Sequence, residues 1–198
     1  SKDFGQVYDL PLNLGLSANY GLSDRDEVSA HIRYMHATGK TFDALTTSAA
    51  ATINGVAVAG SAVLQGQLSN YTEEGLEGEY KHFFDTAVKG FHPYLGGLLG
   101  VKHNNSVKLD LSYQGSSVAT GIGFFDSGWS WSAGLQTGFR YDIHPAVAIG
   151  LETGIRYEGN LSQNTTDINA SSAGGLADVN GGGSRWDIPL MIGLTARF

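Results

Sequence analysis

Charged side chains of both signs recur on one face of several alternating segments. Their types and spacing make them the first candidates for a functional site. These residues are Arg33, Glu77, Glu79, Lys81, Arg140, Glu152 and Arg156. Glycines lie among them on the same face. Charges that are buried together must be paired and hydrogen-bonded. The set is therefore expected to form a structural salt-bridge network inside a closed sheet, or else to line a narrow, porin-like channel.

Two other patterns resemble parts of cofactor or catalytic sites. The sequence Thr38–Thr41 matches the last residues of the phosphate-binding loop motif, but the first glycine of that motif is missing. Ser29 and His31 share one alternating segment, and Glu79 and His82 share another, so the Ser, His and Glu of a hydrolytic triad are all present. A catalytic triad is defined by geometry, and these residue types are common. We therefore expect no catalytic residue, no cofactor and no enzyme activity.

No metal site is expected from the spacing of the potential ligands. The six histidines show no metal-ligand spacing, and the absence of cysteine excludes a thiolate site. Asp126, Asp167 and Asp178 offer oxygen ligands in polar connections, but no run of ligands accompanies them.

Composition excludes several classes of protein. The 198 residues carry a net charge of -7, which argues against nucleic-acid binding through a basic surface. Hydrophobic residues make up 41% of the chain, which argues against disorder. No apolar stretch reaches the length of a membrane-spanning helix. The 28 glycines and the low content of charged residues favour a β protein.

The elements that must position the charged residues are strands, because the dominant hydrophobic period is two. Seven segments alternate in this way or read as strand: 12–22, 28–34, 76–84, 91–102, 131–143, 147–158 and 186–198. Several have the 9–11 residues that a tilted strand needs to cross a bilayer. We expect an eighth strand at Phe4–Asp9, and ten strands with a hairpin from 48–71 is the alternative.

The connections between these segments alternate in length. Short connections lie near 23–26, 85–90 and 142–145, and long ones near 37–73, 103–128 and 159–185. Short turns at one end and long loops at the other are typical of an up-and-down outer-membrane barrel. The expected fold is thus a single all-β domain over 1–198, a closed antiparallel transmembrane β-barrel.

Alternation alone does not show which face points inward, since a soluble lipid-binding barrel has the same period. Glycines and charges of both signs on the polar face favour a narrow polar interior. Aromatic residues end many of the apolar runs, as they do at membrane interfaces. They are Tyr20, Tyr34, Phe84, Tyr141, Tyr157 and Trp186. We therefore expect the apolar face to point outward.

The chain resembles the small outer-membrane β-barrels of Gram-negative bacteria, such as the OmpA membrane domain, OmpX and the Opa-type surface proteins. The residues that carry the resemblance are the terminal run 186–198, Pro93–Gly96, and the Phe139–Tyr141 and Ile155–Tyr157 pair. Within the terminal run, the positions that look like the group's assembly signal are Leu190, Ile192, Leu194 and Phe198. Ala196 departs from the pattern, because the group often has an aromatic residue there.

The resemblance implies a multi-pass protein of the bacterial outer membrane that contacts the lipid bilayer, lipopolysaccharide and the barrel-assembly machinery. We expect a structural and surface-interaction role, in which the long extracellular loops contact partners or neighbouring copies. Eight-stranded barrels are usually filled by side chains, so a channel for small solutes is the first alternative rather than the preferred function. An outer-membrane hydrolase and a soluble lipid-binding barrel with reversed facing are the others.

Overall fold

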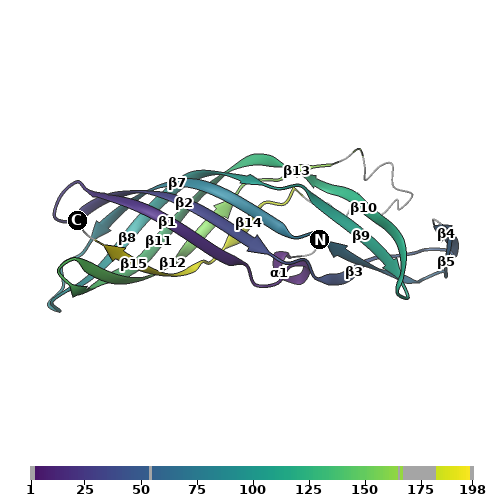
Figure 1. The fold of residues 1–198 in the computed structure, drawn as a ribbon, viewed down its shortest axis with the longest axis horizontal. Helices are drawn as coiled ribbons and strands as arrows, with labels where there is room; N and C mark the ends of the chain where they lie inside the picture. Colours follow the sequence, from purple (N-terminus) through teal and green to yellow (C-terminus); the bar gives the residue numbers. More distant parts are fainter. Residues whose placement is uncertain (1–2, 54, 165, 167–181, 197–198) are drawn as a thin grey trace.

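A computed structural model describes residues 3–53, 55–164, 166 and 182–196 (Figure 1). Apart from the short helix α1 (Phe4–Val7), its named elements are β-strands, and every strand pairing is antiparallel. The strands run at a common tilt along an elongated molecule. In the described part of the chain, no helix is long and apolar enough to cross a membrane. The protein is therefore all-β, as expected.

The larger sheet, called the main sheet below, contains eight strands in the order β1-β2-β7-β8-β11-β12-β14, with β15 also paired to β12. Their bounds are β1 Leu12–Gly21, β2 Asp26–Ala37, β7 Tyr71–Phe83, β8 Phe91–Asn104, β11 Gly128–His144, β12 Val147–Glu158, β14 Arg185–Asp187 and β15 Leu190–Ala196. Strands β14 and β15 pair with β12 in one register and are separated only by Ile188 and Pro189. The eight strands thus occupy seven positions across the sheet.

The main sheet curls around a shared interior, because side chains of strands that are not neighbours meet inside it. Arg156 on β12 lies 3.3 Å from Glu77 on β7. Arg140 on β11 lies 2.8 Å from Glu27 on β2. Among the described residues, however, β1 pairs only with β2, and β15 pairs only with β12. The sheet curls, but backbone pairing does not close it.

The apolar face of the main sheet points outward, as the glycines and mixed charges of the polar face favoured. Leu16 on β1 is 75% exposed and Ile192 on β15 is 85% exposed, whereas Glu158 on β12 is fully buried. Other outward apolar residues are Ile32, Leu76, Leu95, Leu99, Trp131, Leu135, Ile149 and Ile155. The three short connections, 22–25, 84–90 and 145–146, lie together at one end of this sheet, which we call the turn end.

Beyond the opposite end, five strands form a second sheet, called the distal sheet, in the order β13-β10-β9-β6-β3. Their bounds are β3 Thr41–Thr46, β6 Val63–Leu68, β9 Val107–Tyr113, β10 Ser116–Asp126 and β13 Ser162–Gln163. A separate hairpin joins β4 (Ala51–Ile53) to β5 (Val56–Val58). Each distal-sheet strand continues a main-sheet strand after a break of one to three residues, for example at Asn105–Ser106 between β8 and β9.

The distal sheet is built with the opposite facing. Its interior is apolar, with Leu64, Leu109 and Val118 almost fully buried in one hydrophobic cluster. Its outer face carries polar residues such as Lys108 and Asp110, which are exposed. The same polypeptide strands therefore pass from a region with charges inside to a region with hydrocarbon inside.

Two expectations about the strands are wrong. Phe4–Asp9 is not the eighth strand: Phe4–Val7 form α1, and only Tyr8 makes a bridge, to Gly39. The spacing of Phe4, Val7 and Tyr8 places all three against the hydrophobic cluster of the distal sheet, which one turn of helix permits and an alternating strand does not.

The long connections are also more ordered than expected. The segments near 37–73 and 103–128 contain strands β3 to β6 and β9 to β10 rather than open loops, because their apolar residues are buried in the distal sheet. The hairpin expected within 48–71 exists as β4 and β5, but it does not join the main sheet. Most of the long connection near 159–185 lies outside the described residues.

Gly100 on β8 tests how closely the inner wall is packed. A Cβ added there would lie 2.6 Å from Glu77 Cγ and 2.7 Å from the Leu76 carbonyl oxygen, whereas a Cβ on Gly193 would meet no atom within 4 Å. We expect Gly100→Ala to lower the free energy of unfolding by about 1–3 kcal/mol through overpacking. Gly193→Ala is the control, with a change below about 0.5 kcal/mol. Urea unfolding in mild detergent, followed by tryptophan fluorescence, measures both, and equal midpoints would contradict the close packing.

Candidate functional site

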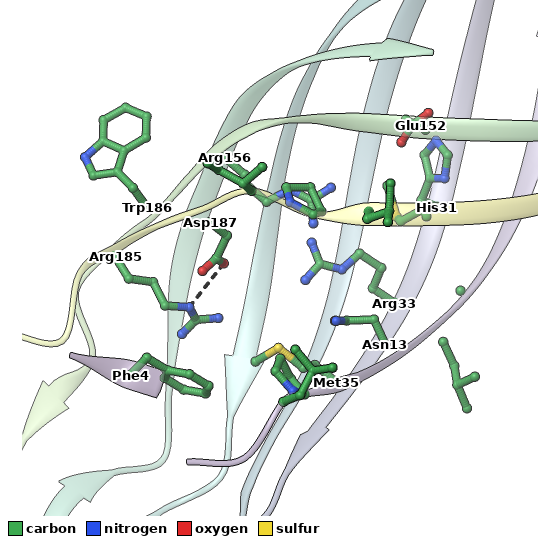
Figure 2. Close-up of a pocket in the computed structure, with 18 of the residues that line it drawn as sticks. Phe4, Asn13, His31, Arg33, Met35, Glu152, Arg156, Arg185, Trp186 and Asp187 are labelled. Carbon is green, nitrogen blue, oxygen red and sulfur yellow. Dashed lines mark hydrogen bonds and ion pairs between the residues drawn. The ribbon is translucent and has the colours of Figure 1, made fainter. Parts of the chain in front are cut away.

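A cavity of about 1370 Å³ lies inside the curled main sheet and extends into the distal sheet. Arg33, Arg156 and Arg185 line its main-sheet part, while Phe4 and Val107 belong to its distal part. Figure 2 shows the three arginines directed towards a common space, with Met35 and Asn13 beside them. The interior is thus charged in the main sheet and apolar in the distal sheet.

The charged groups nearest the distal sheet gather around Glu73 on β7. Its carboxylate lies 3.0 Å from Lys102 Nζ and 3.1 Å from Arg185 Nη2, and it accepts a hydrogen bond of 2.7 Å from the Tyr71 hydroxyl. Lys102 also lies 2.6 Å from Glu158. All of these groups are inaccessible or nearly so, which makes each charge dependent on its partner.

The next group towards the turn end is centred on Glu77. One oxygen of its carboxylate accepts hydrogen bonds from Arg33 at 3.0 Å and from the Ser132 hydroxyl at 3.2 Å. The other oxygen lies 3.3 Å from Arg156 Nη2. Glu77 therefore joins three strands that are not all neighbours, and it holds two guanidinium groups against the inner wall.

A third group contains two of the predicted acids and the lysine between them. Lys81 Nζ lies 3.1 Å from Glu79 and 3.3 Å from Glu152. Glu79 is also 2.7 Å from His31 Nε2 and accepts a bond of 2.8 Å from the Gln136 amide. Both carboxylates thus have partners from more than one strand.

Glu152 and Arg140 are held near the turn end of the interior. Glu152 accepts a short hydrogen bond from the Tyr94 hydroxyl. Arg140 donates to Glu27 at 2.8 Å and lies over the ring of Phe83.

The structure places all seven predicted network residues in the interior and divides them into three groups. Arg33, Glu77 and Arg156 meet; Glu79, Lys81 and Glu152 meet; and Arg140 bonds to a residue outside the predicted set. Five further charged residues of the interior were not in the predicted set: Glu27, Glu73, Lys102, Glu158 and Arg185. Most stand at or just beyond the ends of the alternating segments, where the period-two signal is weakest.

The predicted interfacial aromatics fall into two groups at opposite ends of the outward apolar face. Tyr20, Phe84 and Tyr141 lie near the turn end. Tyr34, Tyr157 and Trp186 lie near the distal sheet, and the ring centroids of Tyr157 and Trp186 are 5.1 Å apart.

Three of the four residues of the predicted assembly signal lie on the last strand, β15. Leu190, Ile192 and Leu194 point outward on β15 and are highly exposed. Phe198 lies outside the described residues.

Of the residues considered for a hydrolase, Ser29, His31 and Glu79 lie close together on β2 and β7, with Ser29 opposite Glu79 in the strand register. His31 contacts Glu79, but Ser29 Oγ has no hydrogen-bond partner in the described part of the chain. His82 instead contacts Asp26 at the turn end, with Nδ1 and Oδ1 separated by 2.8 Å.

The described residues also contain no group of three or more histidine or acidic side chains placed to hold a metal ion. Of the three acids considered for such a site, Asp126 accepts a hydrogen bond from Asn164 at 2.8 Å. Asp167 and Asp178 lie outside the described residues.

Two groups outside the main-sheet interior are held by their surroundings, Asp26 at the turn end and Tyr8 after α1. Asp26, the first residue of β2, accepts hydrogen bonds from the Ser23 and Tyr80 hydroxyls and lies 2.8 Å from His82 Nδ1, and these contacts hold the turn between β1 and β2. Burial of the Tyr8 hydroxyl raises its pKa above the ordinary value, so this group stays neutral at physiological pH.

Glu77 tests whether the network holds the sheet together. We expect Glu77→Gln to lower the free energy of unfolding by about 3–5 kcal/mol, because it leaves Arg156 buried without its acidic partner and removes the nearest of the three carboxylates around Arg33. Glu74→Gln is the matched control, since Glu74 is a solvent-exposed acid on the same strand. Urea unfolding in mild detergent measures both variants. A Glu77→Gln variant as stable as the control would mean that the buried charges contribute little.

Comparisons with known proteins identify no relative. No family model, no curated protein and no solved structure matches this chain. The function must therefore be argued from the residues of the chain itself.

Proposed function

We propose that this protein is an outer-membrane β-barrel protein whose main sheet crosses the lipid bilayer and whose distal sheet projects from the cell surface. The observation that carries the proposal is the reversal of facing between the two sheets. Hydrocarbon faces outward on the main sheet and inward on the distal sheet. A water-soluble protein does not usually expose so large an apolar surface, whereas a membrane barrel requires one.

The dimensions of the main sheet support this proposal. Strands β1, β2, β7, β8, β11 and β12 have 10 to 17 residues. A tilted strand needs about 9–11 residues to cross the hydrocarbon core. The two groups of aromatic residues at the ends of the apolar face have the placement of interfacial girdles. Such a protein would contact lipopolysaccharide and would depend on the barrel-assembly machinery for insertion.

The role that we propose is structural and interactive, with the distal sheet as the contact surface. Paired charges occupy the interior of the main sheet, and an apolar cluster occupies the distal sheet, so a polar solute that crossed both would have to leave charged surroundings for apolar ones. The outward residues of β9, such as Lys108 and Asp110, are polar and accessible. Such a surface suits contact with partners or neighbouring copies in water.

Cysteine labelling tests the bilayer position, because the chain has no cysteine of its own. In vesicles, we expect Leu99→Cys on the outward face of β8 to react with a membrane-impermeant maleimide at least tenfold more slowly than Lys108→Cys on β9. Both side chains point outward and are exposed, so they form a matched pair that differs in the expected surroundings. The folded protein should also change its gel mobility after boiling.

Equal labelling of the two cysteines in protein that is soluble without detergent would contradict the membrane position. The soluble lipid-binding barrel would then be the better hypothesis for function.

Conductance measurements test the channel alternative. We expect the protein in planar bilayers to show no steady single-channel current. Replacing Arg140 and Glu152 together by alanine should mainly reduce stability, by several kcal/mol, because each leaves a buried partner unpaired. A stable variant with a new or altered conductance would instead favour a selective channel.

A further inference from the structure

The two edge strands of the main sheet, β1 and β15, leave a gap that we call the seam. All ten residues of β1 are exposed, on both of its faces, whereas β2 and β7 have buried inward residues. Inward residues (Asn13, Ser17) and outward residues (Leu14, Leu16) of β1 line the same cavity, and so do residues from both faces of β15. The cavity therefore opens through the seam.

An open seam is incompatible with a bilayer. Alternate backbone N–H and C=O groups along the free edges of β1 and β15 have no pairing partner in the described residues. In hydrocarbon, each such unsatisfied group is strongly unfavourable, which is why membrane barrels have no free edges. This step rests on the proposed function, because water could satisfy the same groups in a soluble protein.

The directions of the strands limit what can fill the seam. Six successive antiparallel pairings separate β1 from the position of β15, so these two strands run the same way, from the distal sheet to the turn end. Direct closure would make a parallel pair. A second copy inserted in the same orientation also offers only edges that run this way. One strand that runs from the turn end to the distal sheet can pair antiparallel with both edges.

We infer that the seam is the docking site of one further β-strand, antiparallel to both β1 and β15, supplied by polypeptide that leads into α1. Such a strand ends beside the distal sheet, where α1 lies with Phe4 and Val7 in the hydrophobic cluster. Consecutive strands usually lie side by side. A strand that enters α1 and returns as β1 would therefore complete an eight-stranded antiparallel barrel.

The walls of the seam describe the side chains that fit it. The inward residues at its edges are uncharged, and Gly15, Ser17 and Gly193 among them are small, so the interior beside these three has room for larger inward side chains. Arg156 lines this cavity, and its buried Nε–H has no acceptor in the described part of the chain. The strand therefore alternates apolar residues facing lipid with polar residues facing inward, at least one of them a hydrogen-bond acceptor.

The test adds a strand to the chain in front of Ser1. The extension copies the sequence of β12, Val147–Glu158, which has the required alternation. In the protein, β12 already pairs antiparallel with the edge of β15 that faces away from the seam. A control extension has the same composition in an order that destroys the alternation. One cysteine at the centre of each extension is combined with Asn13→Cys or Ser17→Cys on β1, or with Gly193→Cys or Thr195→Cys on β15.

We expect the alternating extension to form a disulfide in most molecules of the β1 variants and, separately, of the β15 variants. The disulfide yield should be at least fivefold above that of the control extension. Added in trans as a peptide to the folded 198-residue protein in detergent, the alternating segment should slow deuterium exchange of the β1 amides at least tenfold. This second measurement decides the question if the extended chain fails to fold.

Three results would overturn the inference. Efficient disulfide formation between Ser17→Cys and Gly193→Cys in the 198-residue chain would show that the edges close directly. A disulfide-linked dimer through Ser17→Cys alone would show that a second copy fills the seam. Slow exchange of the β1 amides in lipid without any peptide or dimer would assign the seam to lipid. Because cross-linking is done in detergent, its outcome is independent of the vesicle labelling that tests the proposed function.

Discussion

The interior of this protein depends on three inward glutamates of β7. Glu73 binds cations from β8 and β14, Glu77 binds cations from β2 and β12, and Glu79 meets groups from β2, β7 and β11. An unpaired buried charge destabilises a protein more than a pair stabilises it. The charges can therefore pair only if the sheet curls, because the acids and most of their cations lie on different strands.

The inward position of the charges in the main sheet is matched by a different distribution of polar and apolar residues in the distal sheet. Where the outer face is apolar, the interior holds polar groups, and their burial is compensated only by one another. Where the strands continue into the distal sheet, the outer face is polar and the interior becomes an ordinary hydrophobic cluster around Leu64 and Leu109. Short breaks between consecutive strands, such as Asn105–Ser106 between β8 and β9, mark the boundary between the two regions.

The sequence was informative wherever a strand has two different faces. The alternation of 12–22, 131–143 and 147–158 predicted β1, β11 and β12. The glycines and mixed charges on the polar face then predicted the inward position of Arg140 and Arg156. The sequence was uninformative at 91–102, because both faces of that segment are alike and the inward position of Lys102 could not be predicted. It was also uninformative in the distal sheet, where the apolar residues occur among polar ones. Phe4–Asp9 was mistaken for a strand because its burial against Tyr71 depends on contacts from distant parts of the chain.

Closure of the sheet is a separate constraint that no hydrophobic pattern contains. Alternation specifies which way side chains face, but an edge strand and a central strand of a membrane barrel have the same alternation, because both meet lipid on one side and the interior on the other. What differs is the pairing of backbone groups, which is common to all residue types. The parity of the strands decides it: with seven positions, β1 and β15 run the same way, and only an additional strand restores antiparallel pairing around the whole circumference.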